Sequence, residues 1–157
     1  MIYVFDTNSF SEMSPYFPDV FPAFWAKFEQ AVAAGKITST REAPRELNDG
    51  PQHHVLDWCN RNKAIFATPD AQETGFIPQI FAVPHLRQLV GQKQMLRGTP
   101  VADPFIIARA AALRGSVVSE ETPKPGKPNI PAVCQHFGIP CMKLGDFLWA
   151  KRWTFWR

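Results

Sequence analysis

Short apolar runs alternate along the chain with longer segments that carry hydrophobic residues at helical spacing. The first run, residues 1–5, is rich in β-favouring residues and stops abruptly at Asp6, Thr7 and Asn8, so it predicts a buried strand that delivers Asp6 at its carboxyl end. Further strands are predicted at 36–40, 116–119 and 139–143. Because strands alternate with helices, the pattern favours an α/β fold with a mainly parallel sheet covered on both faces.

Two helical segments have clear start and stop signals. An aromatic-rich segment, 17–32, has Pro22 in its first turn and Gly35 after its end. Asp103 occupies an N-cap position before Pro104, and that helix is predicted to stop at Gly115. The other predicted helices are 41–47, 55–62, 130–137 and 144–150, with a polar connection at 9–15. Residues 77–96 are largely helical, and Pro84 either begins a second helix or kinks a single one.

Composition limits the class of protein. The 157 residues, 45% of them hydrophobic, fit one domain over 1–157, and a net charge of +3 permits a nucleic-acid partner without requiring one. The three cysteines are odd in number and lack a Cys-x-x-Cys pair, which favours buried thiols in a reducing cytosol over disulfides or zinc. No signal peptide or membrane-length apolar run is recognised, so we expect a cytoplasmic protein without a membrane partner.

Four acids follow a predicted strand or open a predicted helix: Asp6, Glu46, Asp103 and Glu121. Right-handed crossovers bring the ends of the first strand and of the strand at 116–119 to one rim of a parallel sheet, where these carboxylates could meet. Carboxylates a few ångström apart repel by about 4 kcal/mol per pair at an effective dielectric near 20, and a hard cation such as Mg²⁺ or Mn²⁺ relieves that repulsion. The predicted chemistry is metal-assisted hydrolysis of a phosphodiester.

Two of these acids also have a plainer interpretation. N-capping alone explains Asp103, and a solvated, charged helix start explains Glu46. Glu42 lies one turn before Glu46 and could take its place, because the boundary of that helix is open. The basic, proline-punctuated segment 123–129 is either a solvated loop or a phosphate contact, and the tail 151–157, which mixes bases with aromatics, either packs on a neighbouring surface or contacts nucleic acid.

The acids and their neighbours, taken in order, resemble the PIN domain family, especially a PIN-like branch common among bacterial toxin–antitoxin systems. The resemblance covers nearly the whole chain. The segments that carry it are Val4-Phe5-Asp6-Thr7-Asn8-Ser9, Glu46-Leu47, Ala102-Asp103-Pro104, Val117-Val118-Ser119-Glu120-Glu121, Ile130-Pro131-x-Val133-Cys134 and Ile139-x-Cys141.

This resemblance implies a three-layer α/β/α fold and a Mg²⁺- or Mn²⁺-dependent endoribonuclease, often the toxin of a pair held inactive by a cognate antitoxin. The four acids would hold the metal, Asp6 directly, while Asn8 and Ser119 would orient carboxylates or water. Glu121 stands where the family usually has Asp, so it binds metal directly or through water. PIN-like toxins often pair, which makes a homodimer plausible.

Two other functions compete with the nuclease. A PIN-like module that has lost catalysis would serve as an RNA- or protein-binding scaffold, but retention of all four acids argues against it. A phosphatase of the haloacid dehalogenase type would have Asp-x-Asp after the first strand, whereas this chain has Asp6-Thr7-Asn8. Neither the RNA target nor the identity of an antitoxin follows from the sequence.

Overall fold

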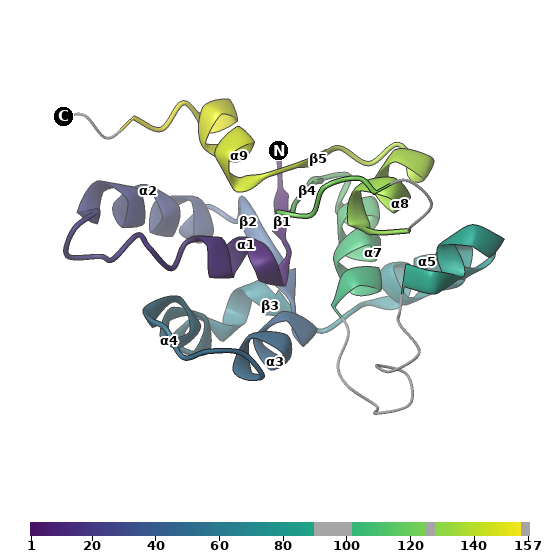
Figure 1. Ribbon diagram of the computed structural model, residues 1–157, viewed down its shortest axis with the longest axis horizontal. Coiled ribbons are helices and arrows are strands. Elements are labelled where there is room, and N and C mark those ends of the chain that lie inside the picture. Colours follow the sequence, from purple (N-terminus) through teal and green to yellow (C-terminus); the bar gives the residue numbers. More distant parts are fainter. Residues whose placement is uncertain (90–101, 125–127, 155–157) are drawn as a thin grey trace.

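The computed structural model describes residues 1–89, 102–124 and 128–154 (Figure 1). Its centre is a five-stranded sheet in the order β3-β2-β1-β4-β5, in which every neighbouring pair is parallel. The strands are β1 (Tyr3–Phe5), β2 (Ile37–Thr40), β3 (Phe66–Ala67), β4 (Ser116–Val118) and β5 (Cys141–Met142). The α/β class and the parallel sheet predicted from the sequence are therefore confirmed.

Helices connect successive strands and cover both faces of the sheet. The α-helices are α1 (Thr7–Glu12), α2 (Pro22–Ala33), α3 (Glu42–Asn48), α4 (His54–Arg61), α5 (Ala71–Phe81), α7 (Asp103–Leu113), α8 (Ile130–Phe137) and α9 (Leu144–Lys151). Two 3₁₀ segments are η1 (Lys63–Ile65) and η2 (Pro84–Leu89). No helix in the described part of the chain is long and apolar enough to cross a membrane.

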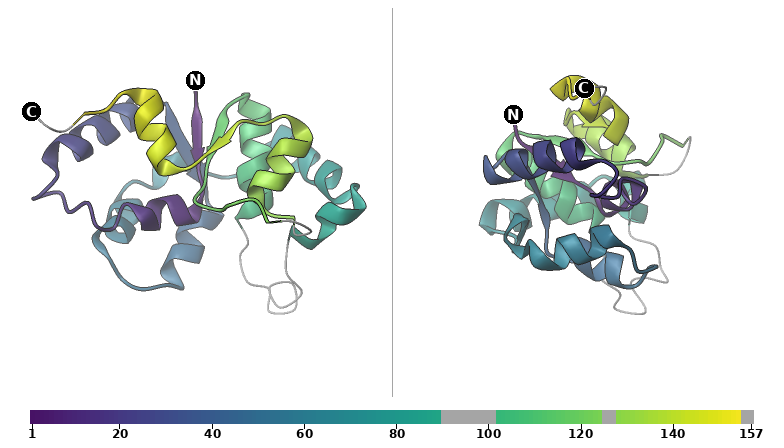
Figure 2. Two further views of the ribbon diagram at one scale, coloured as in Figure 1. Left: turned by 45° about the horizontal axis from the view of Figure 1, so that its top comes forward. Right: turned by 90° about the vertical axis from the view of Figure 1, so that its left-hand side faces the viewer.

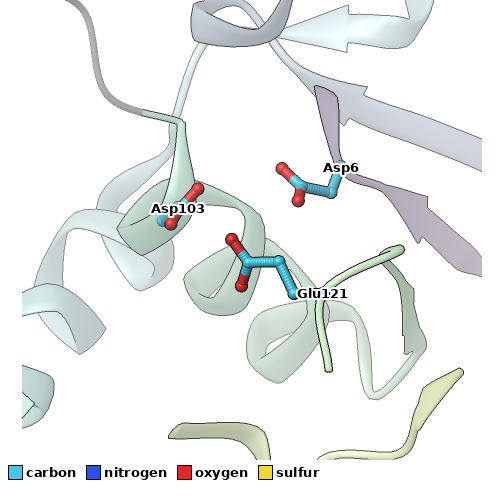
Figure 3. Close-up of side chains that lie close together, drawn as sticks. All are labelled: Asp6, Asp103 and Glu121. Carbon is cyan, nitrogen blue, oxygen red and sulfur yellow. The ribbon is translucent and has the colours of Figure 1, made fainter. Parts of the chain in front are cut away.

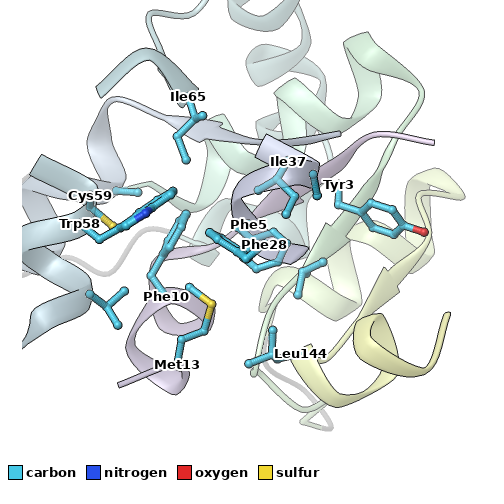
Figure 4. Close-up of a cluster of buried hydrophobic side chains, with 14 of the residues drawn as sticks. Tyr3, Phe5, Phe10, Met13, Phe28, Ile37, Trp58, Cys59, Ile65 and Leu144 are labelled. Carbon is cyan, nitrogen blue, oxygen red and sulfur yellow. The ribbon is translucent and has the colours of Figure 1, made fainter. Parts of the chain in front are cut away.

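The side chains of β1 alternate between two separate hydrophobic clusters. Tyr3 and Phe5 face an aromatic cluster built with α1, α2, α4 and α9, in which the Phe5 ring meets Phe28 edge-on at 5.8 Å between centroids (Figure 4). Val4 faces the opposite way, into an aliphatic cluster built with α5, α7 and α8. Figures 1 and 2 show these two groups of helices on opposite sides of the sheet, which gives three layers.

Several helix boundaries differ from the sequence prediction. The polar connection predicted at 9–15 is partly helical, because Asp6 accepts a hydrogen bond from the Thr7 amide and caps α1. The aromatic helix begins at Pro22 rather than residue 17, and Phe17 and Val20 before it are exposed. Pro84 begins a separate 3₁₀ segment, and α5 begins at Ala71, where Asp70 and Glu73 form a capping box. Side-chain capping accounts for the starts of α1 and α5, whereas the helix that begins at Pro22 has no side-chain cap.

The end of α7 shows a different use of glycine from the one predicted. Arg114, rather than Gly115, adopts the left-handed conformation that ends the helix. At Gly115 a Cβ atom would collide with the carbonyl oxygen of Ile2, so glycine is required there for close approach to the chain before β1. The three cysteines are free thiols, with Cys59 and Cys134 buried.

The strand order defines one special position at the edge of the sheet. From β1 the chain adds β2 and β3 on one side, whereas β4 and β5 lie on the other side. The carboxyl ends of β1 and β4 therefore flank the point at which the winding of the sheet reverses, where ligands bind in open α/β folds. Asp6 follows β1 at this point, and residues 119–121 follow β4.

Candidate metal centre

Three carboxylates converge where the winding of the sheet reverses. Asp6 follows β1, Asp103 is the first residue of α7, and Glu121 lies two residues beyond Ser119 in the connection after β4. One oxygen of each carboxylate lies within 4.8 Å of the others, and Figure 3 shows the three groups turned toward a common space. Three of the four acids named from the sequence are thus brought together from three separate elements.

Asp6 is held in one orientation by hydrogen bonds to both of its oxygens. The Thr7 amide donates to Oδ1 at 2.8 Å, and the Ser119 hydroxyl donates to Oδ2 at 3.1 Å. Ser119 Oγ in turn accepts a hydrogen bond from the Glu121 amide at 3.2 Å. Ser119 therefore joins the ends of β1 and β4 and fixes Asp6 relative to the backbone of Glu121.

Asp103 is not the N-cap that the sequence pattern predicts. Ala102 occupies the N-cap position, and the helix begins at Asp103, with Pro104 as its next residue. No side-chain capping bond is formed at this helix start. Because the Asp103 carboxylate makes no capping bond, it is available to face Asp6 and Glu121.

Glu46 lines the same cavity but stands outside the tight cluster. The cavity has a volume of about 340 Å³, and Glu46 Oε1 accepts hydrogen bonds from Thr7 Oγ1 at 2.7 Å and from the Ala102 amide at 3.3 Å. Glu42, the alternative second acid, is buried beside Arg41, whose Nε donates to Glu42 Oε1 at 2.9 Å. Glu42 is absent from the described lining of the cavity, which favours Glu46 as the second acid.

Two helix N-termini anchor the acids after β4. The amide of Ile130, which begins α8, donates to Glu121 Oε2 at 2.9 Å, and the amide of Leu144, which begins α9, donates to Glu120 Oε1 at 2.7 Å. Asn8, expected to orient a carboxylate or water, lines the cavity, and its Oδ1 accepts the Glu120 amide at 3.0 Å. Its side chain therefore positions the backbone that presents Glu121.

Burial and mutual repulsion make the cluster hard to ionise without a cation. Burial, and then the charge of Glu121, raise the pKa of Asp6 to about 7, and burial together with Asp6 and Glu121 raises the pKa of Asp103 to about 9. Burial also raises the pKa of Glu46. Neither ion pair found among the described residues involves these acids. The donor set, all carboxylate oxygen, fits a hard divalent cation such as Mg²⁺ or Mn²⁺.

Two cavity residues were not singled out from the sequence. Thr7 holds Glu46 through its hydroxyl, and Ser11, on α1, lines the cavity. Thr7 directly follows the first acid, and its hydroxyl next to a strand end was an available signal. Nothing in the sequence marked Ser11. Helix α1 was not predicted, so the side of this helix that faces the cavity could not be assigned.

Sequence and structure comparisons place the chain among known proteins. The fold and the cluster of Asp6, Asp103 and Glu121 define an α/β protein with a carboxylate site at the point where the winding of its sheet reverses. The chain belongs to the DUF4411 family, described as a domain of unknown function, which it matches over residues 3–155. No curated protein matches it.

Two solved structures are similar over almost the full chain. VapBC2 from Rickettsia felis, bound to a DNA fragment from their promoter, shares 12% identity with a TM-score of 0.49, covering 91% of this chain and 98% of the other. FitAcB from Neisseria gonorrhoeae shares 13% identity with a TM-score of 0.48, covering 90% and 96%. Likenesses at this level carry no conclusion about activity.

Proposed function

We infer that this protein is a metal-dependent endoribonuclease of the PIN-like type, acting as the toxin of a toxin–antitoxin pair in the cytoplasm. The observation that carries the nuclease proposal is the convergence of Asp6, Asp103 and Glu121 within 4.8 Å where the winding of a parallel sheet reverses. The ordered motifs that resemble the PIN family support the same function. The toxin role, a cognate antitoxin and a homodimer are supported by that resemblance alone.

In this proposal the chain's own residues bind and orient. Asp6, Asp103 and Glu121 would hold Mg²⁺ or Mn²⁺, and Glu46 would complete the acidic set from the rim of the cavity. Ser119 would keep Asp6 aligned, and Thr7 would keep Glu46 aligned, through the hydrogen bonds described above. A bound divalent cation would supply an activated water and stabilise the charge that develops on the leaving oxygen.

The test is cleavage of an end-labelled, mixed-sequence RNA pool in Mn²⁺, in Mg²⁺ and in EDTA. We expect cleavage only with metal, and a loss of at least about a hundredfold in Asp6→Asn, because one metal-bound oxygen anion is removed at nearly constant shape. Asp19→Asn, which changes an exposed acid outside the cavity, should cleave like the wild type. Growth arrest on expression of the wild type, and not of Asp6→Asn, would support the toxin role.

Calorimetric titration with Mn²⁺ separates an inactive protein from an unsuitable substrate. Binding to the wild type that is much weaker in Asp103→Asn would support the metal centre even for a narrow RNA target. A folded wild type that neither binds Mn²⁺ nor cleaves RNA would overturn the proposed function.

A further inference from the structure

A second polar cavity adjoins the metal centre. It has a volume of about 440 Å³ and is lined by residues that include Thr122, Lys124 and Asn129. Asn8 and Glu121 line both this cavity and the one that contains the carboxylate cluster. A chain-like ligand whose reacting group lies at the carboxylates would therefore extend directly into the second cavity.

The second cavity offers donors, although two acids border it. Glu120 Oε1 and Glu121 Oε2 already accept the N-terminal amides of α9 and α8, and these helix ends offset part of the acids' negative charge. Asn8 Oδ1 accepts the Glu120 amide, which fixes the orientation of the carboxamide and leaves the Nδ2 group to donate elsewhere. The wall shared by the two cavities thus carries an available N–H donor.

Lys124 adds the positive charge. Its side chain is exposed, it lines the second cavity, and neither of the ion pairs formed within the described ranges includes it. Without a cation, the carboxylates of the metal centre would repel the phosphates of an RNA strand. A positive charge nearby is therefore needed to hold the strand beside these carboxylates. An ammonium group beside a free amide donor is suited to a phosphate oxygen.

We propose that Lys124 and Asn8 form a phosphate subsite, which binds the internal phosphodiester next to the one that is cleaved. This inference rests on the proposed ribonuclease function and names a substrate contact outside the metal centre. Lys124 positions the strand and takes no part in proton transfer. Its removal therefore affects binding and KM, while kcat stays near the wild-type value.

The first experiment measures binding without cleavage. A fluorescein-labelled, single-stranded RNA of mixed sequence is titrated in EDTA over a series of salt concentrations. Lys124→Gln should weaken binding about fivefold at 0.1 M salt and reduce the slope of log K against log salt by about 0.7, the change expected when one phosphate contact to a single strand is lost. The matched control is Lys36→Gln, since Lys36 is exposed directly before β2, at the amino end of that strand, whereas both cavities lie beyond the carboxyl ends of β1 and β4.

The two lysine variants decide the outcome. An effect confined to Lys124→Gln supports the subsite, whereas equal effects in both variants, or none in either, would overturn it. Binding is also compared for the same RNA with and without a 5′-phosphate. The loss in Lys124→Gln should be the same for both, and a loss that needs the terminal phosphate would exclude an internal phosphodiester.

Cleavage kinetics separate this inference from the nuclease proposal. In RNA that carries a neutral methylphosphonate beside the cleaved bond, KM should rise for the wild type and rise much less for Lys124→Gln, because that contact is already lost. Cleavage with KM unchanged in Lys124→Gln would refute the subsite and leave the nuclease intact. If binding depends on Lys124 but the wild type cleaves nothing in any metal, the nuclease proposal fails and the binding subsite stands.

Discussion

Helix α7 carries two buried acidic environments that are neutralised in different ways. Two turns into the helix, Arg109 Nη1 donates to Glu73 Oε1 at 2.9 Å, and Arg109 Nε donates to Thr38 Oγ1 at 3.0 Å. Glu73 is 2% exposed, as is Asp6. At the start of the same helix, Asp103 faces Asp6 and Glu121, and neither ion pair in the described parts of the chain supplies them with a cation.

The difference separates a structural acid from a site. Burial of a carboxylate costs free energy unless a partner of opposite charge and hydrogen bonds offset it. Glu73 has both, because Arg109 pairs with one of its oxygens and the Asp70 amide donates to the other. Asp6 has hydrogen bonds only, and its nearest charges are acids. A divalent cation, as in the proposed function, would supply the opposite charge that Asp6 lacks.

The largest effect is expected when the guanidinium of Arg109, which pairs with Glu73, is removed. Arg109→Met leaves Glu73 Oε1 charged and unpaired in the interior, so the free energy of unfolding should fall by about 3–5 kcal/mol. Urea denaturation measures this. The double variant Arg109→Met/Glu73→Gln is the matched comparison and should recover part of the loss, since the unpaired charge is gone. A loss below about 1 kcal/mol in the single variant would mean that the pair does not neutralise Glu73 in the way described.

At the metal centre, by contrast, removing a charged group is expected to stabilise the metal-free protein. The pKa values of Asp6 and Asp103 are raised to about 7 and about 9, so between about pH 4 and pH 9 the metal-free folded state binds more protons than the unfolded state. These groups therefore stabilise the fold fully below pH 4, and that contribution is lost as the pH rises through 7 and 9. At pH 8 in EDTA, Asp6→Asn should raise the free energy of unfolding by about 2–4 kcal/mol.

Urea denaturation of both proteins at pH 5 and pH 8 tests the sign. The wild type in EDTA should lose stability between these pH values, Asp6→Asn should lose less, and Mn²⁺ should restore the wild type at pH 8. Asp19→Asn should follow the wild type, because this exposed acid lies outside the cavity. If Asp6→Asn is destabilising at pH 8 without metal, repulsion within the cluster is not the dominant force there.

Most of the framework could be predicted from the sequence because it depends on local patterns. The apolar run before Asp6, the spacing from Phe105 to Leu113 and the run at β4 each encode an element by themselves. Two elements that were missed or displaced depend on side-chain hydrogen bonds: α1 on the Asp6 cap and the start of α5 on the capping box at Asp70. A single polar residue can satisfy several partners, and the sequence does not indicate which partner it has in the fold.

The candidate site could be predicted as a set of acids but not as a geometry. Parallel strand order brings Asp6 and Glu121 together, and both were named for that reason. The choice between Glu42 and Glu46 depended on the rotation of α3, which the Thr7 hydroxyl and the Ala102 amide fix by binding Glu46. The Asp103 carboxylate can face the other acids because α7 begins at Asp103, one residue earlier than predicted. Sequence patterns do not locate a helix start to within one residue.

The smallest effect is expected from a hydroxyl that aligns the site without carrying charge. Ser119→Ala removes the donor to Asp6 Oδ2 and the acceptor of the Glu121 amide, so stability should fall by about 1 kcal/mol and Mn²⁺ should bind about tenfold more weakly. Calorimetric titration with Mn²⁺ measures the affinity.

Ser9 provides a matched control for this variant. It lies in α1 and is equally buried, but its hydroxyl donates to the Val118 carbonyl of β4 and not to a carboxylate. Ser9→Ala should therefore lose stability to a similar degree and bind Mn²⁺ like the wild type, and Ser119→Thr, which keeps the hydroxyl, should restore the affinity. Equal losses of affinity in the two alanine variants would show that general loosening between β1 and β4, rather than alignment of Asp6, controls metal binding.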